Sequence, residues 1–104
     1  MSVTVKEFQN LIKRTFYHKD SLRGVEKTFV WFVEEVGELA KSFKKKEREL
    51  MEAEFADVFA WLCSLANLVD VNLEGVSFKK YGKGCPKCGK IPCICKEPFK
   101  KEVP

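Results

Sequence analysis

The stretch FVWFVEEVGELAKSF, residues 29–43, decides the fold, because its apolar and acidic residues recur at helical spacing. With a rotation of about 100° per residue, Glu34 and Glu38 share one face of this helix and Glu35 lies beside them. The opposite face is apolar and carries Phe29, Phe32, Val33, Val36, Leu39, Ala40 and Phe43. This helix alone has two interpretations: the glutamates form either a solvated face or half of a site.

A second acidic pair, Glu54 and Asp57, lies on the next helical pattern, and residues three apart are surface neighbours on a helix. The same wheel groups this pair with the apolar residues Leu50, Trp61, Leu65 and Leu68. Small and polar residues take the other side: Ala53, Ala56, Ala60, Ser64 and Asn67. Carboxylates without a partner in an apolar sector raise the free energy of the folded state, so we expect Glu54 and Asp57 to have a charged partner.

Convergence of all these carboxylates requires a cation, and hard oxygen ligands suit Mg²⁺ or Mn²⁺. The expected metal ligands are Glu34, Glu35, Glu38, Glu54 and Asp57. The alternative is a structural salt bridge from Lys27 or Arg48. A di-iron site is disfavoured, because it needs Glu-x-x-His pairs and the only histidine, His18, lies outside the pattern.

The rest of the helical part follows from spacing and capping. One helix is expected from Val3 to His18, capped by Thr4 or Ser2, and a second from Asp20 or Ser21 to about Lys46. A third is expected over 49–69 and a short fourth over 72–82. We therefore predict an all-α fold of four helices, with the long central pair as the core and a helical domain over residues 1–81.

The composition changes at residue 82, where a second region, 82–104, rich in Cys, Gly, Pro and Lys, begins. Four of the five cysteines lie there: Cys85, Cys88, Cys93 and Cys95. A Cys-Pro-x-Cys-Gly turn aims two sulfurs at one point, so we expect a zinc knuckle holding structural Zn²⁺. Free or oxidised thiols are the alternative. Cys63 lies in a helical pattern with Phe59 and Ala66 and indicates packing.

The distribution of charge and hydropathy disfavours some classes of function. Residues 1–81 carry 13 basic and 13 acidic side chains, so the excess of +4 lies entirely in the tail, and nucleic-acid binding by the helical part is not expected. No apolar stretch is long enough to span a bilayer, and the first ten residues have no signal-peptide core. We expect a cytoplasmic protein. The apolar surface of 29–43 and 55–69 exceeds what two short helices cover, which predicts a homodimer or homotetramer.

The pairing of Glu34-Glu35-Val36-Gly37-Glu38 with Glu54-x-x-Asp57 resembles the MazG-like family of all-α nucleoside triphosphate pyrophosphohydrolases. The resemblance covers about residues 25–81. It implies Mg²⁺-dependent cleavage between the α- and β-phosphates of a nucleoside triphosphate, giving a monophosphate and pyrophosphate. It further implies an oligomer that removes unwanted nucleotides.

The resemblance also implies roles for single residues. Glu34 or Glu35 binds metal with Glu38, Glu54 and Asp57, and either Glu34 or Glu35 orients or deprotonates the attacking water. Candidates for substrate contact are Lys27, Trp31, Lys79, Lys80 and Tyr81. Each lysine has the alternative of a solvated surface charge, and Trp31 can either stack on a base or pack in the core or at a subunit interface.

One competing function belongs to another class. The chain is then a non-enzymatic zinc-knuckle module whose basic tail binds RNA or a protein partner. Removal of the tail separates the two hypotheses, because the module loses its binding activity whereas the enzyme keeps its acidic metal site.

Overall fold

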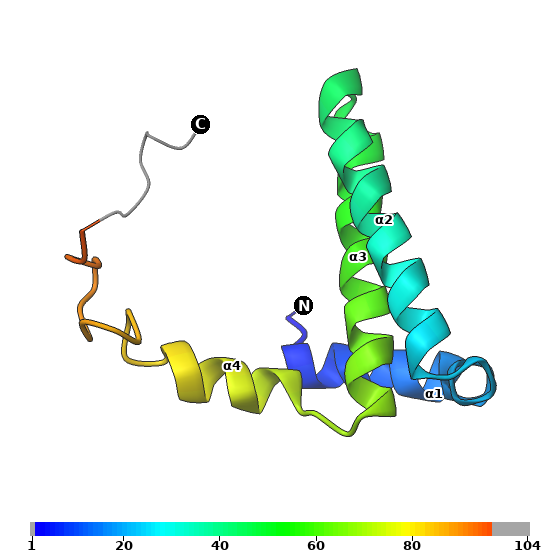
Figure 1. The fold of residues 1–104 in the computed structure, drawn as a ribbon, viewed down its shortest axis with the longest axis horizontal. Helices are drawn as coiled ribbons and strands as arrows, with labels where there is room; N and C mark the ends of the chain where they lie inside the picture. The colour runs from blue at the N-terminus through cyan, green and yellow to red at the C-terminus, as the bar shows by residue number, and fades with distance from the viewer. Residues whose placement is uncertain (1, 97–104) are drawn as a thin grey trace. The chain divides into compact units, whose positions relative to one another are not determined.

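A computed structural model describes residues 2–96, and the end of the predicted basic tail, 97–104, lies outside the described residues. Within 2–96 the chain forms four helices and no strand, which confirms the all-α prediction (Figure 1). The helices are α1 (Val5–Arg23), α2 (Val25–Lys45), α3 (Arg48–Leu68) and α4 (Leu73–Tyr81). The Cys-rich segment follows α4.

The chain divides into two compact units, Met1–Glu74 and Gly75–Pro104. The first, the helical unit, contains α1, α2, α3 and the start of α4. The second, the cysteine unit, contains the rest of α4 and the Cys-rich segment. The functional division between 81 and 82 stays a prediction, because compactness alone does not assign function.

The start of α1 is fixed by its own side chains. The Thr4 hydroxyl accepts a hydrogen bond from the backbone N–H of Glu7 (3.0 Å), and the Glu7 carboxylate accepts one from the Thr4 backbone N–H (2.9 Å). This reciprocal capping box satisfies two amides that have no partner within the helix. It confirms Thr4 as the cap.

The corner between α1 and α2 lies later than the sequence indicated. A break at Asp20 or Ser21 was wrong: α1 continues to Arg23, and the chain turns at Gly24, whose φ of 91° favours glycine. Asp20 is not a cap for the next helix. Its carboxylate instead pairs with Arg23 in the last turn of α1 (2.7 Å), and its backbone carbonyl accepts a hydrogen bond from the Gly24 N–H (2.9 Å).

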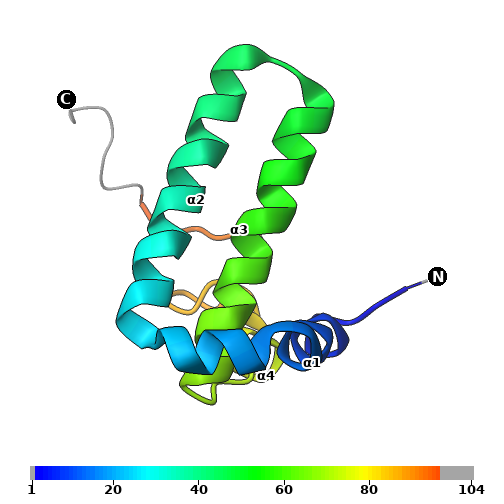
Figure 2. The ribbon, with the colours of Figure 1, turned by 90° about the vertical axis from the view of Figure 1, so that its right-hand side faces the viewer.

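Helices α2 and α3 run antiparallel side by side, and α1 crosses them at the end near Gly24 (Figure 2). Aromatic side chains join the three helices in pairs. The Phe8 ring of α1 stacks on Phe59 of α3, with 5.2 Å between centroids. Trp31 and Trp61 meet edge to face at 5.5 Å, and Phe43 and Phe55 do so at 6.1 Å. These contacts hold the α2–α3 pair at both ends.

The side of α3 that faces α1 is partly polar. Ser64 and Asn67 are buried, whereas the wheel had set them opposite the packed sector. The Asn67 side chain accepts a hydrogen bond from the Gln9 amide (3.0 Å) and donates one to the Gln9 carbonyl (3.2 Å). The expectation of one packed sector was wrong for these positions, because α3 packs on two helices and a hydrogen-bonded amide pair can be buried.

The buried apolar core is small. Among the described residues the buried apolar side chains are Ile12, Cys63 and Ala66. Within residues 2–96 no single helix is long and apolar enough to cross a membrane, although α3 and α4 taken together pass the same test of length and composition.

Candidate functional site

Three carboxylates from the two long helices converge. Glu35 of α2 and Glu54 and Asp57 of α3 each place one oxygen so that the three oxygens lie within 4.8 Å of one another. The antiparallel packing of α2 against α3 causes this meeting, since the Glu-x-x-Asp spacing puts Glu54 and Asp57 on one face of α3. We call these three residues the carboxylate triad.

The triad has the properties of a cation site. One oxygen of Glu54, Oε1, is buried and has no hydrogen-bond partner among the described residues. Burial raises the pKa of the Glu35 carboxyl above its usual value, and the charges of Asp57 and Glu54 raise it further. A buried oxygen without a donor and three mutually repelling carboxylates are both stabilised by a bound divalent cation. The residues present therefore fit a hard metal ion such as Mg²⁺.

The other two glutamates lie beside the triad and not in it. Glu34 and Glu38 are exposed, and Glu38 pairs loosely with Lys41 (3.7 Å). Their charges still contribute to the raised pKa of Glu35, after those of the two α3 carboxylates. The structure thus brings three of the five candidate ligands together.

The salt-bridge alternative finds no support in the geometry. Arg48 pairs with Glu52, one turn along α3, at 2.9 Å. Within residues 2–96 no ion pair joins Lys27 or Arg48 to the triad.

A cavity of about 310 Å³ lies next to the triad and shares Asp57 with it. Its lining combines aromatic rings, cations and small polar groups. The lining residues are Phe16, Lys19, Asp20, Arg23, Trp31, Asp57, Ala60, Trp61 and Ser64. Aromatic faces beside fixed cations and the carboxylate triad can accept a planar ring joined to charged groups.

Arg23 is held in place at the wall of this cavity. Its guanidinium donates to the buried carboxylate of Asp20 (2.7 Å) and to the hydroxyl of Thr28 (3.2 Å). It also lies over the rings of Trp31 and Trp61, 4.7 and 5.0 Å from their centroids. The corner at Gly24 therefore positions both a cation and two indole rings.

The candidate substrate contacts fall in different places. Trp31 lines the cavity and also packs on Trp61, so both of its interpretations stay open. Lys27 is exposed and is not among the lining residues. Lys79, Lys80 and Tyr81 belong to the cysteine unit, where the Lys80 ammonium lies 5.6 Å from the centre of the Tyr81 ring.

Sequence reasoning missed Arg23 and Lys19 and counted Trp61 only as an apolar residue. A signal was present: Gly24 is the only glycine before Gly37, Arg23 directly precedes it, and Asp20 lies one turn before it. A helix break at this glycine would have placed their side chains beside the start of α2.

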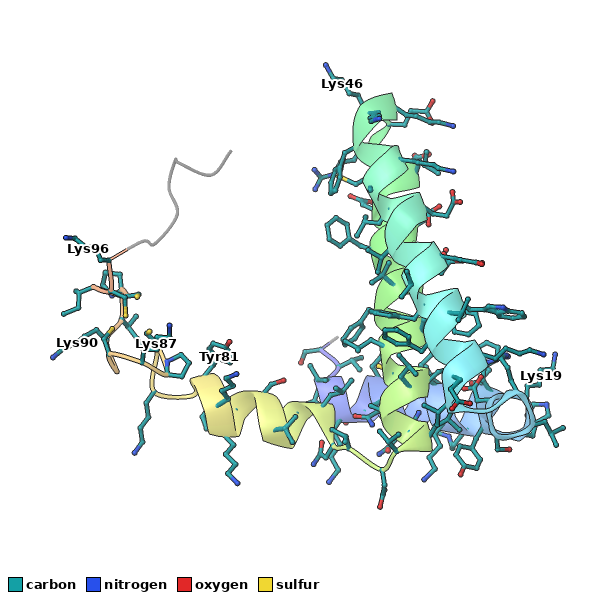
Figure 3. The ribbon with its side chains drawn as sticks, in the orientation of Figure 1. Lys19, Lys46, Tyr81, Lys87, Lys90 and Lys96 are labelled. Carbon is teal, nitrogen blue, oxygen red and sulfur yellow. The ribbon has the colours of Figure 1, made fainter. Side chains whose placement is uncertain are left out.

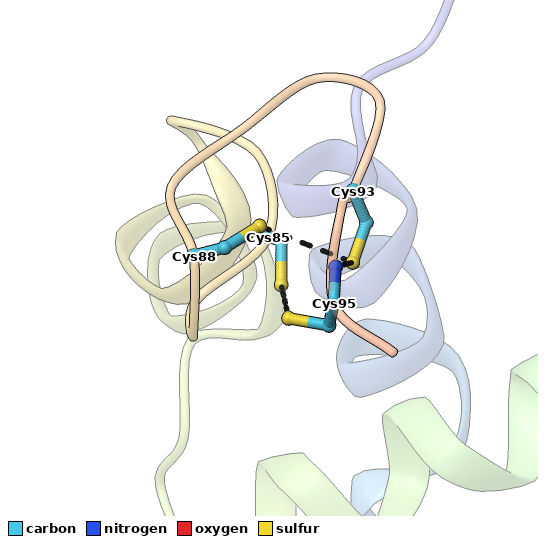
Figure 4. Close-up of side chains that lie close together, drawn as sticks. All are labelled: Cys85, Cys88, Cys93 and Cys95. Carbon is cyan, nitrogen blue, oxygen red and sulfur yellow. Dashed lines mark hydrogen bonds between the residues drawn. The ribbon is translucent and has the colours of Figure 1, made fainter. Parts of the chain in front are cut away.

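The cysteine unit holds a second group of potential metal ligands. One Sγ atom from each of Cys85, Cys88, Cys93 and Cys95 lies within 4.8 Å of the other three (Figure 4). Cys63 is buried in α3 of the helical unit, where burial raises the pKa of its thiol to about 11. This cysteine is therefore a packing residue and takes no part in the cluster.

The family model of the MazG nucleotide pyrophosphohydrolase domain matches residues 23–89. No curated protein sequence matches the chain. The family match begins at Arg23, includes both triad helices and ends between the two cysteine pairs. Because it spans more than half of the chain, this protein belongs to the MazG nucleotide pyrophosphohydrolase domain family.

Proposed function

We propose that the helical unit hydrolyses a nucleoside triphosphate to a nucleoside monophosphate and pyrophosphate, with Mg²⁺ or Mn²⁺ bound by Glu35, Glu54 and Asp57. The observation that carries the proposal is the carboxylate triad with its unpartnered Glu54 oxygen, next to a cavity lined by aromatic rings and cations. Family membership supports the same substrate class.

The chemistry follows from charge. A triphosphate is polyanionic and is repelled by an acidic site, so the metal, when bound, supplies the positive charge for the phosphates and lowers the pKa of water. Arg23 and Lys19 at the cavity wall add fixed positive charge near Asp57. Trp31 and Trp61 offer ring faces on which a base can stack.

In the proposed step, the oxygen of water bonds to the α-phosphorus as the bond from that phosphorus to the α,β-bridging oxygen breaks. Pyrophosphate leaves with the bridging oxygen, and the proton of water passes to a carboxylate of the Glu34-Glu35 pair. Glu35 belongs to the triad, whereas Glu34 is exposed beside it, so we assign metal binding to Glu35 and proton acceptance to Glu34. Glu38, one turn after Glu35, is the proposed fourth metal ligand.

The proposal is tested by product analysis on a panel of nucleoside triphosphates with Mg²⁺, in water labelled with heavy oxygen. We expect monophosphate and intact pyrophosphate, with the label in the monophosphate. Label in the pyrophosphate would indicate attack at the β-phosphorus. Orthophosphate as the first product would contradict the choice of bond.

A homo-oligomer is part of the proposal. Large apolar side chains on the two long helices remain about half exposed, among them Phe29 (52%), Val33 (49%), Phe43 (50%) and Phe55 (51%). A soluble monomer rarely exposes so many apolar groups on neighbouring helices, so we propose a homodimer or homotetramer that covers them. Light scattering at micromolar concentration is expected to give at least twice the chain mass, and a monomeric mass would contradict it.

The proposed cellular role is removal of unwanted nucleotides in the cytoplasm, a reducing compartment where thiols stay free to bind metal. Zn²⁺ at the cysteine cluster is proposed separately and takes no part in the hydrolysis. The competing function, a zinc-knuckle module that binds RNA or a protein, predicts no nucleotide turnover. It also predicts that loss of the cysteine cluster, and not of the triad, abolishes binding to the RNA or protein partner.

A further inference from the structure

The cysteine unit has no apolar core of its own. Within 75–96, the described part of this unit, no residue is buried. Its apolar side chains face solvent: Phe78 is 75% exposed, Ile91 80% and Ile94 71%. Burial of apolar surface therefore cannot stabilise the path of residues 82–96, and another interaction must do so.

The backbone nevertheless turns back sharply on itself. The Gly89 N–H donates to the Cys85 carbonyl (2.7 Å), and the Cys85 N–H donates to the Lys90 carbonyl (3.2 Å). Gly84 has a φ of 105°, and a Cβ there would stand 2.5 Å from Cγ1 of Ile91. This close approach requires glycine and returns the chain toward the first cysteine pair.

The turn brings the four sulfurs together at distances that suit a tetrahedral metal (Figure 4). Sγ of Cys85 lies 3.8 Å from Sγ of Cys95, and Sγ of Cys88 lies 3.9 Å from Sγ of Cys93. A tetrahedron with zinc–sulfur bonds of about 2.3 Å has edges of about 3.8 Å. Disulfide sulfurs are only about 2.05 Å apart. The observed pairs thus match two opposite edges of a ZnS₄ tetrahedron.

Backbone amides are placed to stabilise thiolates. The Lys87 N–H donates to Sγ of Cys85 (3.4 Å), and the Cys95 N–H donates to Sγ of Cys93 (3.3 Å). Hydrogen bonding to the charged sulfur favours the form that binds metal.

The surrounding charge is complementary. Four thiolates around one Zn²⁺ carry a net charge of −2. Residues 82–96 contain four lysines and no acidic residue: Lys83, Lys87, Lys90 and Lys96. In Figure 3 the side chains of Lys90 and Lys96 point outward from this segment, where they reduce the negative charge of the site without competing for the sulfurs.

We propose that Cys85, Cys88, Cys93 and Cys95 bind one Zn²⁺ in a closed tetrahedral site that folds residues 82–96. All four ligands come from the protein, which leaves no position for water or substrate, so the site is structural. It goes beyond the hydrolytic function: zinc binding here requires no activity at the carboxylate triad. The family match stops at residue 89, before the second pair of ligands.

The test measures zinc in the full-length protein after growth with zinc and purification without chelator. Cys88→Ser removes a ligand, and Cys63→Ala is the matched control, because it removes the one cysteine outside the cluster. We expect one zinc per chain in the parent and the control. Second-shell changes cost 10–100-fold in metal affinity, so loss of a ligand should cost Cys88→Ser about 100-fold or more. Cobalt in place of zinc should give the intense visible absorption of a tetrahedral tetrathiolate in the parent and the control only.

Three outcomes would overturn the proposal. One is a parent chain without zinc whose four thiols titrate freely in the native state. Another is a mass and thiol titration that reveal disulfides in place of metal. The last is zinc retained equally by the parent and Cys88→Ser, which would place the ion elsewhere, such as at the carboxylate triad. Native far-UV circular dichroism of Cys88→Ser verifies that the helices remain folded, so that zinc loss reports on the ligand.

Discussion

The helical unit and the cysteine unit both bury little apolar surface, and different interactions stabilise them. In the helical unit, paired aromatic rings and buried hydrogen bonds hold three helices together, and the metal candidates are oxygen atoms partly enclosed between two of them. In the cysteine unit nothing described is buried, and the metal candidates are sulfurs at the surface. Helix packing thus positions the oxygens of the carboxylate triad. The Cys-rich segment, in contrast, is expected to fold only when its sulfurs bind metal.

Zinc removal should produce the largest difference between the two units. With a chelator that binds zinc strongly and Mg²⁺ weakly, amide hydrogens of residues 82–96 should lose their protection from exchange. No described residue of that segment is buried, so its few backbone hydrogen bonds should open once the proposed metal is removed. Amide hydrogens of α1, α2 and α3 should keep theirs. Hydrogen–deuterium exchange with and without the chelator measures both regions in one experiment, and retained protection in 82–96 would contradict the zinc-dependent fold.

Loss of a triad oxygen should have the next largest effect, confined to the helical unit. Glu54→Gln keeps the side-chain shape and removes the charge of the carboxylate whose Oε1 atom is buried. We expect kcat/KM with Mg²⁺ to fall on the order of 100-fold or more, because a lost metal contact removes several kcal/mol of transition-state stabilisation.

Glu52→Gln is the matched control on the same helix. Glu52 is exposed and pairs with Arg48, and a surface ion pair of this kind contributes little. Activity of the control should stay within about twofold of the parent, and its zinc content should not change. Equal losses in both variants would mean that general charge, and not the triad, supports activity.

A smaller effect is expected in the pH dependence of the metal-free protein. Because the pKa of Glu35 is raised in the folded state, the folded chain binds more protons than the unfolded chain between the ordinary pKa, 4.5, and the raised value. Stability should therefore fall as pH rises through that interval. Melting curves across it should show this fall in the parent and a weaker one in Glu35→Gln. Identical slopes for the two proteins would contradict the raised pKa.

Much of the fold was predictable from the sequence, because helical periodicity and capping depend on local residues. Thr4, and the lysines at the end of α2, marked helix ends correctly. The corner at Gly24 was misplaced because Asp20 looks like a helix cap, and only its ion pair with Arg23 reveals otherwise. A local sequence pattern does not show whether an aspartate caps the next helix or pairs with a cation in its own helix.

The candidate site was predictable as a set of residue types and less so as a geometry. Helical spacing put the acidic residues on facing helices, but it could not separate Glu35 from Glu34, since adjacent residues differ only in how α2 is rotated toward α3. The cavity was not predictable, because it requires Arg23 and Trp61 from distant positions. The cysteine cluster was the reverse case: its ligands lie within eleven residues, so spacing alone indicated it.

The central claim, that the carboxylate triad is the site of a divalent metal, is tested most directly by melting curves of the parent and Asp57→Asn, each with and without Mg²⁺. Three carboxylates repel one another without metal, and Mg²⁺ stabilises only the folded arrangement. The metal-free variant should therefore melt higher than the metal-free parent, gain little from Mg²⁺, and lose hydrolysis. A variant that keeps the full Mg²⁺ stabilisation and full activity of the parent would contradict the account.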